Sequence, residues 1–224
     1  MRAAIAGLFL VVVTAGAAGA HERPNILWIS AEDLVGFPSL LRGAGYWCTN
    51  NGKTDYNFTR EFQAGWHQSN ARAHWRKRAD PRQPFFAVFN LTVTHESGLF
   101  GDMRATARRT LPQEALRDPA AVRMPPWYPD THVVRTCLAA RLELAALLDR
   151  EVGRILDELA ADGLDDDTIV FFWGDHGEGV PHGKRSLTEH GLRVPLVVHV
   201  PRRFQNAAAL PGGAAPRGAT ANPV

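Results

Sequence analysis

The sequence predicts an α/β fold, in which a mostly parallel β-sheet is flanked by helices. Runs of β-branched and aromatic residues at 24–30, 85–92 and 168–173 have the composition and length of buried strands. A long amphipathic helix signal precedes the last run, and a helix that leads into a strand favours a parallel sheet. Acidic or histidine residues follow each run, and ligands bind at the carboxyl edge of such sheets.

The chain is expected to divide into three segments. Its 224 residues, 45% of them hydrophobic, suffice for one α/β domain with a core over residues 21–204. Residues 1–20 have the pattern of a signal peptide, because Arg2 precedes an apolar run that ends in small residues. The alternative is a transmembrane anchor, but the run is too short to span a bilayer. We therefore expect a periplasmic or secreted protein without stable membrane insertion, and a disordered tail over 205–224.

The composition gives no reason to expect a nucleic-acid partner. The formal net charge is +2, and the signal peptide contributes one arginine to it, so the mature chain is nearly neutral. The basic cluster at 72–78 is either a solvated face or a phosphate-binding patch. Cys48 and Cys137 can pair in an oxidising compartment, although Cys137 lies on an apolar helical stripe and is typical of a core residue.

The first predicted strand, 24–30, leads into an acidic pair, Glu32 and Asp33. Two carboxylates this close repel each other unless a cation lies between them. Glu32 and Asp33 are therefore candidate metal ligands, and the alternative for Asp33 is to cap a following helix.

The next segment contains a short helix at 37–44, a brief strand at 46–49 and a polar turn that ends in Lys53. The predicted strand at 85–92 then leads to His95. His95 is either a functional residue at a strand end or a hydrogen-bonded loop histidine.

Residues 97–129 are polar, contain several prolines and predict a loop. Asp130 or Thr131 can cap a long helix that ends near Asp162, where a glycine follows. The apolar stripe of this helix indicates core packing and implies no cofactor. A fourth strand is expected at 194–200.

The stretch 168–184 carries the strongest functional signal. Its apolar strand, 168–173, is followed by a glycine, then by Asp175 and His176, and Lys184 comes a few residues later. Asp175 and His176 are therefore expected at the sheet edge. Both are residue types that bind metal ions, and glycines flank them. The alternative is a polar strand end that only turns the chain.

Four ordered blocks of the sequence resemble the sulfatase family over about residues 23–204: RPNILWISAEDL, FPSLLRGAGYWCTNNGKTDYNF, PFFAVFNLTVTHES and DGLDDDTIVFFWGDHGEGVPHGKRSLTEHGLRVPL. The resemblance implies the alkaline-phosphatase-like α/β fold and the hydrolysis of sulfuric esters, with a sulfated polysaccharide as a candidate substrate. It also implies that Glu32, Asp33 and Asp175 bind a divalent metal, usually Ca²⁺. His176 stands where many members have asparagine, and it would tolerate Zn²⁺ or Mn²⁺.

The same resemblance places three further residues around the sulfate group. Lys53, His95 and Lys184 fall where the family has cationic side chains and a histidine. Together with the metal ion, the two lysines would neutralise charge on the sulfate oxygens as the ester bond breaks. His95 can protonate the leaving group.

The sequence departs from the family pattern after the first acidic pair. Family members carry there a Cys-x-Pro-Ser-Arg type motif, whose cysteine is oxidised to the formylglycine nucleophile. In this chain Leu34 runs directly into residues 35–37, so the resemblance implies an incomplete domain, internally deleted near 34–36. Cys48 lies in a different block and does not match the nucleophile. The missing segment should also leave part of the sheet uncovered.

Three functional hypotheses remain open at this point. The first is an exported, metal-dependent sulfuric ester hydrolase that lacks its nucleophile. The second is a metal-dependent phosphatase or phosphodiesterase of the same superfold, for which Ser30 and Ser39 are poorly placed nucleophiles. The third is a non-catalytic remnant that binds a cation or an anion.

Overall fold

The computed structural model describes residues 23–30, 38–54, 65–99 and 102–205, and the predicted signal peptide and most of the predicted tail lie outside these ranges. The described residues form a six-stranded sheet in the order β3-β2-β4-β1-β5-β6. Its strands are β1 (Asn25–Ser30), β2 (Trp47–Asn51), β3 (Gln68–Ser69), β4 (Phe85–Asn90), β5 (Thr168–Trp173) and β6 (Leu196–His199). The helices are α1 (Pro38–Gly43), α2 (Asp102–Thr110), α3 (His132–Ala161), α4 (Glu189–Leu192) and α5 (Arg202–Gln205). Short 3₁₀ turns occupy Trp75–Lys77, Glu96–Leu99, Gln113–Ala115, Pro119–Ala121 and Asp165–Asp167.

The sheet is mostly parallel, which confirms the predicted fold class. Strands β2, β4, β1 and β5 run in the same direction, and β6 alone is antiparallel, at the edge beside β5. In the register of the central strands, Ser30 of β1 lies opposite Asn90 of β4 and Trp173 of β5. These three strands therefore end together at one edge of the sheet.

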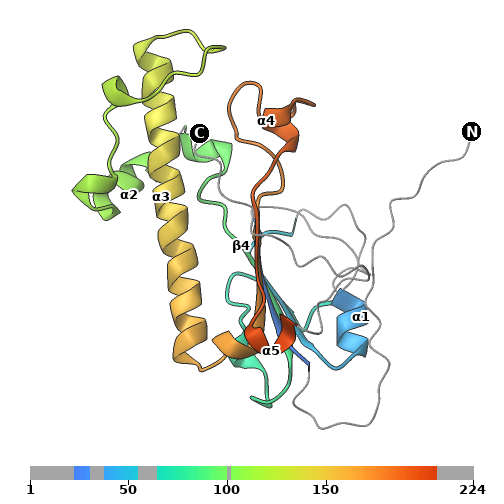
Figure 1. The fold of residues 1–224 in the computed structure, drawn as a ribbon. Helices are drawn as coiled ribbons and strands as arrows, with labels where there is room; N and C mark the ends of the chain where they lie inside the picture. Colours follow the sequence, from blue (N-terminus) through green and yellow to red (C-terminus); the bar gives the residue numbers. More distant parts are fainter. Residues whose placement is uncertain (1–22, 31–37, 55–64, 100–101, 206–224) are drawn as a thin grey trace, which may run out of the picture.

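Helix α3 covers one face of the sheet and α1 covers part of the other (Figure 1). On the α3 face, buried Leu27, Phe85 and Val170 pack against Ile155 and Leu159 of the helix. Burial of this apolar surface is the main source of stability for the fold.

The predicted limits of the long helix are confirmed. The side chain of Thr131 caps its first turn by accepting a hydrogen bond from the Val134 N–H. Gly163, just past the end, has a φ of +67°, a left-handed conformation that favours glycine and ends the helix.

The α1 face is buried near the middle of the sheet and open toward its edge. Cys48, Phe86 and Val88 are buried there. On the edge strand β6, the side chains of Leu196 and Val198 are 62% and 44% exposed. The edge strand thus leaves apolar side chains largely exposed within the described part of the chain.

One sequence-based expectation was wrong, and one open alternative did not occur. Cys48 and Cys137 are free thiols, since Cys48 is buried within the α1 face and Cys137 lies on α3. The segment 97–129, expected to be a loop, contains α2. This helix is mostly polar and is held by tertiary contacts, with Ala107 and Leu111 buried against Leu144 of α3. Among the described residues, no helix has the length and apolar character required to cross a bilayer.

Leu27 offers a direct test of the core. Its side chain is fully buried between the central strands and α3, so Leu27→Ala should lower the free energy of unfolding by about 2–5 kcal/mol. The control is Leu40→Ala on α1, where the side chain is 62% exposed, which should change the free energy of unfolding by less than about 0.5 kcal/mol. Urea denaturation measures both, and equal effects would contradict the described core.

Candidate functional site

The strand ends bring together the three residues predicted to bind an anion. Lys53 follows β2, His95 follows β4, and Lys184 lies on the loop after β5. The Nζ of Lys184 is 3.5 Å from Nε2 of His95. Partial burial of His95, followed by the positive charges of Lys184 and Lys53, lowers the pKa of its imidazole below the usual 6.5. His95 is therefore neutral near pH 7.

His95 is held by hydrogen bonds at both ring nitrogens. The backbone N–H of Ser97 donates to Nδ1 at 3.3 Å, and the Ser97 hydroxyl lies 2.8 Å from the same nitrogen. If Nδ1 accepts from the Ser97 N–H, the neutral ring carries its proton on Nε2; if Nδ1 donates to the Ser97 hydroxyl, Nε2 accepts from the Lys184 ammonium. In both tautomers the two side chains are close enough for one anion to contact both.

Two buried asparagines, which the sequence analysis did not select, position Lys53. The Nδ2 of Asn90 donates to Oδ1 of Asn50 at 2.7 Å. The side-chain amides of Asn50 and Asn90 also donate to the Lys53 carbonyl oxygen, at 3.0 and 3.3 Å. The only sequence signal was an asparagine near the end of each buried strand, which is unusual in a strand core.

Glycines allow the loop after β5 to approach the His95 segment. A Cβ atom on Gly179 would lie 2.5 Å from the Cβ of Glu96, closer than side chains tolerate. At Gly177 a Cβ would overlap the backbone carbonyl of His190. Any larger residue at these two positions would therefore push the loop away from its neighbours.

Lys184 is held in a constrained turn. His182 and Arg185, on either side of Gly183-Lys184, have φ values of +69° and +72°, which non-glycine residues rarely adopt. The Lys184 N–H donates to the carbonyl of Glu178 at 2.7 Å. Such strain persists where the surroundings fix the backbone, and it concentrates at functional sites.

An ion pair joins this turn to the segment after β4. Arg185 donates to both carboxylate oxygens of Glu96, at 2.8 and 2.7 Å. This bidentate pair lowers the pKa of Glu96 to about 2. Glu96 Oε1 also lies 3.7 Å from Lys184 Nζ, so one carboxylate fixes the turn and partly offsets its positive charge.

Asp175 and His176, the predicted metal ligands after β5, lie close to each other. His176 Nδ1 lies 2.7 Å from the Gly177 carbonyl oxygen, which assigns the Nδ1 proton to that bond and leaves the Nε2 lone pair toward Asp175. Nε2 of His176 and Oδ2 of Asp175 are 3.4 Å apart. This separation is short enough for both side chains to contact one cation.

The remaining predicted metal ligands cannot be placed. Glu32 and Asp33 lie outside the described residues, and within those residues no group of three or more acidic, histidine or cysteine side chains is close enough to hold an ion. Ser30, which immediately precedes this segment, is paired with Trp173, two residues before Asp175.

Cys48 is not a nucleophile. Its Sγ lies inside the α1 face, 3.6 Å from the Pro38 carbonyl oxygen, and burial raises the pKa of the thiol to about 12. It is also at the amino-terminal end of β2, whereas Lys53 follows the carboxyl-terminal end. The sequence-based exclusion of Cys48 is therefore supported.

The comparisons with known proteins point to one family. A family model described as Sulfatase matches residues 17–217. The chain is 38% identical over 193 residues to an ulvan-active sulfatase of Formosa agariphila, covering 74% of this chain and 32% of that protein. It is 37% identical over 84 residues to human N-sulphoglucosamine sulphohydrolase, covering 38% and 17%. The chain thus spans about a third, or less, of these curated relatives.

A solved structure is also similar to part of this chain. The lipoteichoic acid synthase of Listeria monocytogenes aligns with a TM-score of 0.40 and 16% sequence identity, over 74% of this chain and 46% of that chain.

The close approach at Gly179 can be tested by adding one methyl group. Gly179→Ala should lower the free energy of unfolding by about 1–3 kcal/mol and shift the NMR signals of His95, because the Cβ clashes with Glu96. Gly153→Ala is the matched control: nothing lies within 4 Å of its Cβ position on α3, so this change should stabilise the helix by about 1 kcal/mol. Destabilisation by both changes would contradict the loop packing.

The charge coupling at His95 predicts a specific titration. An NMR pH titration should give a pKa below 6.5 for His95, and Lys184→Met should raise it, because a nearby positive charge disfavours the imidazolium. Lys77→Met, at an exposed position on the Trp75–Lys77 turn, should leave it unchanged. The described cluster is wrong if both variants shift the His95 pKa equally or if neither does.

Proposed function

This chain belongs to the sulfatase family, and we propose that it is an exported, metal-dependent sulfuric ester hydrolase by descent, with Lys53, His95 and Lys184 as its sulfate-binding residues. The observation that carries the proposal is the 3.5 Å separation of Lys184 Nζ and His95 Nε2, two nitrogen groups that face each other at the carboxyl edge of the sheet. A sulfate oxygen placed between them accepts from both.

The charge of the site suits a sulfate ester. The Lys184 ammonium and the neighbouring charge of Lys53 compensate the negative sulfate group. His95 is neutral, and in the tautomer with its proton on Nε2 it donates to a sulfate oxygen or to the oxygen of the leaving group. Glu96 limits the repulsion between these cations and keeps Lys184 in place when no anion is bound.

We propose that Glu32, Asp33, Asp175 and His176 hold the divalent ion, with Ca²⁺ as the first candidate because three of these residues supply hard carboxylate oxygens. Glu32 and Asp33 follow Ser30 by two and three residues, so the chain restricts them to within about 7 and 11 Å of it. Ser30 is paired with Trp173, next to the Asp175 loop, which supports a common site. When bound, the ion supplies electrostatic stabilisation of the sulfate oxygens. The nitrogen ligand of His176 is compatible with Zn²⁺ or Mn²⁺.

The attacking group of the family is not encoded in this sequence. No Cys-x-Pro-Ser-Arg type segment lies between Asp33 and Phe37, and Cys48 is buried with a raised pKa. We therefore expect this chain to bind sulfate esters and a metal ion without catalytic turnover.

A sulfated polysaccharide is the substrate class that we propose. One relative is named an ulvan-active sulfatase and another an N-sulphoglucosamine sulphohydrolase, and both names refer to sulfated sugars. The signal-peptide pattern of residues 1–20 agrees with a substrate outside the cell.

The proposal is tested by titrating the chain with methyl sulfate in the presence of Ca²⁺, using isothermal calorimetry. Lys184→Ala should weaken binding about tenfold to a hundredfold, because it removes a charged hydrogen bond, while Lys77→Ala should have no effect. Hydrolysis of an aryl sulfate should not be detected. Preferential binding of a phosphodiester with Zn²⁺ or Mn²⁺ would favour the phosphodiesterase alternative, and turnover of a sulfate ester would contradict the missing nucleophile.

A further inference from the structure

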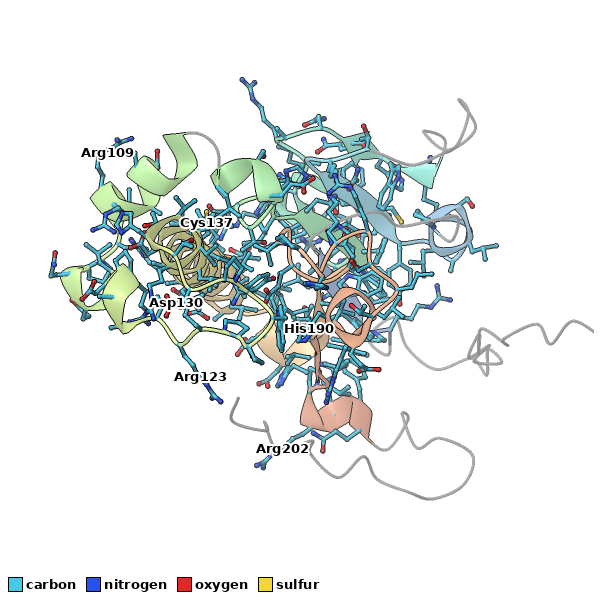
Figure 2. All side chains as sticks on the ribbon, turned by 90° about the horizontal axis from the view of Figure 1, so that it is seen from above. Arg109, Arg123, Asp130, Cys137, His190 and Arg202 are labelled. Atoms are coloured by element: carbon cyan, nitrogen blue, oxygen red, sulfur yellow. The ribbon has the colours of Figure 1, made fainter. Side chains whose placement is uncertain are left out.

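An exposed tryptophan lies beside the loop that carries Lys184. Trp127, just before α3, is 44% exposed, and its indole ring packs on the imidazole of His190 with centroids 4.4 Å apart. The start of α3 and the short helix α4, which contains His190, lie at the same end of the molecule (Figure 1). Figure 2 shows His190 beside the chain segment between Arg123 and Asp130. The indole is thus fixed on one face while much of its surface faces solvent.

The segment that bears Trp127 is attached to the sulfate-site loop at further points. The hydroxyl of Tyr128 donates to the carbonyl oxygen of Pro181. The ring centroids of Tyr128 and His182 are 6.3 Å apart, and His182 precedes Lys184 by two residues. Arg141 of α3 forms an ion pair with Glu178 of the same loop. The position of Trp127 relative to Lys184 is therefore set by several contacts rather than by one flexible chain.

The chemistry of this surface suits a sugar ring. A large, exposed and immobilised aromatic face loses little conformational freedom on binding, and it offers apolar area next to polar groups. The C–H face of a pyranose matches such a surface, whereas its hydroxyl edge can reach the neighbouring histidines and backbone.

We propose that Trp127, backed by His190, is a sugar-binding subsite that holds a neighbouring residue of the polysaccharide whose sulfate group occupies the Lys53–His95–Lys184 site. This inference rests on the proposed function for the identity of the ligand, but it concerns different side chains. Under this proposal, Trp127 binds the sugar chain whether or not that chain carries sulfate groups.

The test compares three probes by isothermal calorimetry: a short ulvan oligosaccharide, its chemically desulfated form, and methyl sulfate. Trp127→Ala should weaken binding of both oligosaccharides about tenfold, and Trp127→Phe should restore part of this loss because an aromatic face remains. The matched control is Leu187→Ala, on the same loop, where the apolar side chain is 90% exposed. It should leave all three affinities unchanged.

The outcomes separate the subsite from the proposed function. If Trp127→Ala leaves the affinity for the desulfated oligosaccharide unchanged, or if Leu187→Ala lowers it equally, the subsite does not exist. If Lys184→Ala fails to weaken methyl sulfate binding, the sulfate site is wrong, and the result for Trp127 with the desulfated probe still stands. Circular dichroism of each variant confirms that the fold is retained.

Discussion

The site depends on the parallel pairing of β4, β1 and β5. Because Asn90, Ser30 and Trp173 share one level of the sheet, the segments that follow these strands leave at the same edge. A shift of register by one residue would move every side chain of a strand to the opposite face. It would place apolar side chains such as Leu27 outside the core and separate the strand-end residues. The hydrophobic core below α3 and the alignment of the site are therefore set by the same register.

A cluster of cationic groups at this edge is unfavourable without compensation. The Lys184 ammonium lies against the neutral His95 ring, and Lys53 adds further positive potential. The structure tolerates this because Glu96 pairs with Arg185 and also lies near Lys184. Local strain in the loop and repulsion in the site are opposed by packing elsewhere, a balance typical of sites preorganised for an anion. The bound anion would remove the remaining repulsion.

Local sequence patterns predicted the parts of the structure that depend on local chemistry. Strand β5 and the long helix follow directly from apolar composition, periodicity and capping residues, and His95 and Lys184 were selected because they follow strands or match a family block. The polar helix α2 was missed because contacts with α3, rather than its own pattern, keep it helical. The Asn50–Asn90 pair was missed for a similar reason, since its residues are 40 positions apart and meet only across the sheet.

The most direct test of the account is a crystal structure of this chain grown with Ca²⁺ and methyl sulfate. The account predicts a sulfate group with one oxygen in hydrogen-bond contact with both Lys184 Nζ and His95 Nε2, and a Ca²⁺ ion ligated by the Asp175 carboxylate on the same edge of the sheet. A sulfate bound elsewhere, for example at the basic cluster 72–78, with Lys184 and His95 unchanged, would contradict it.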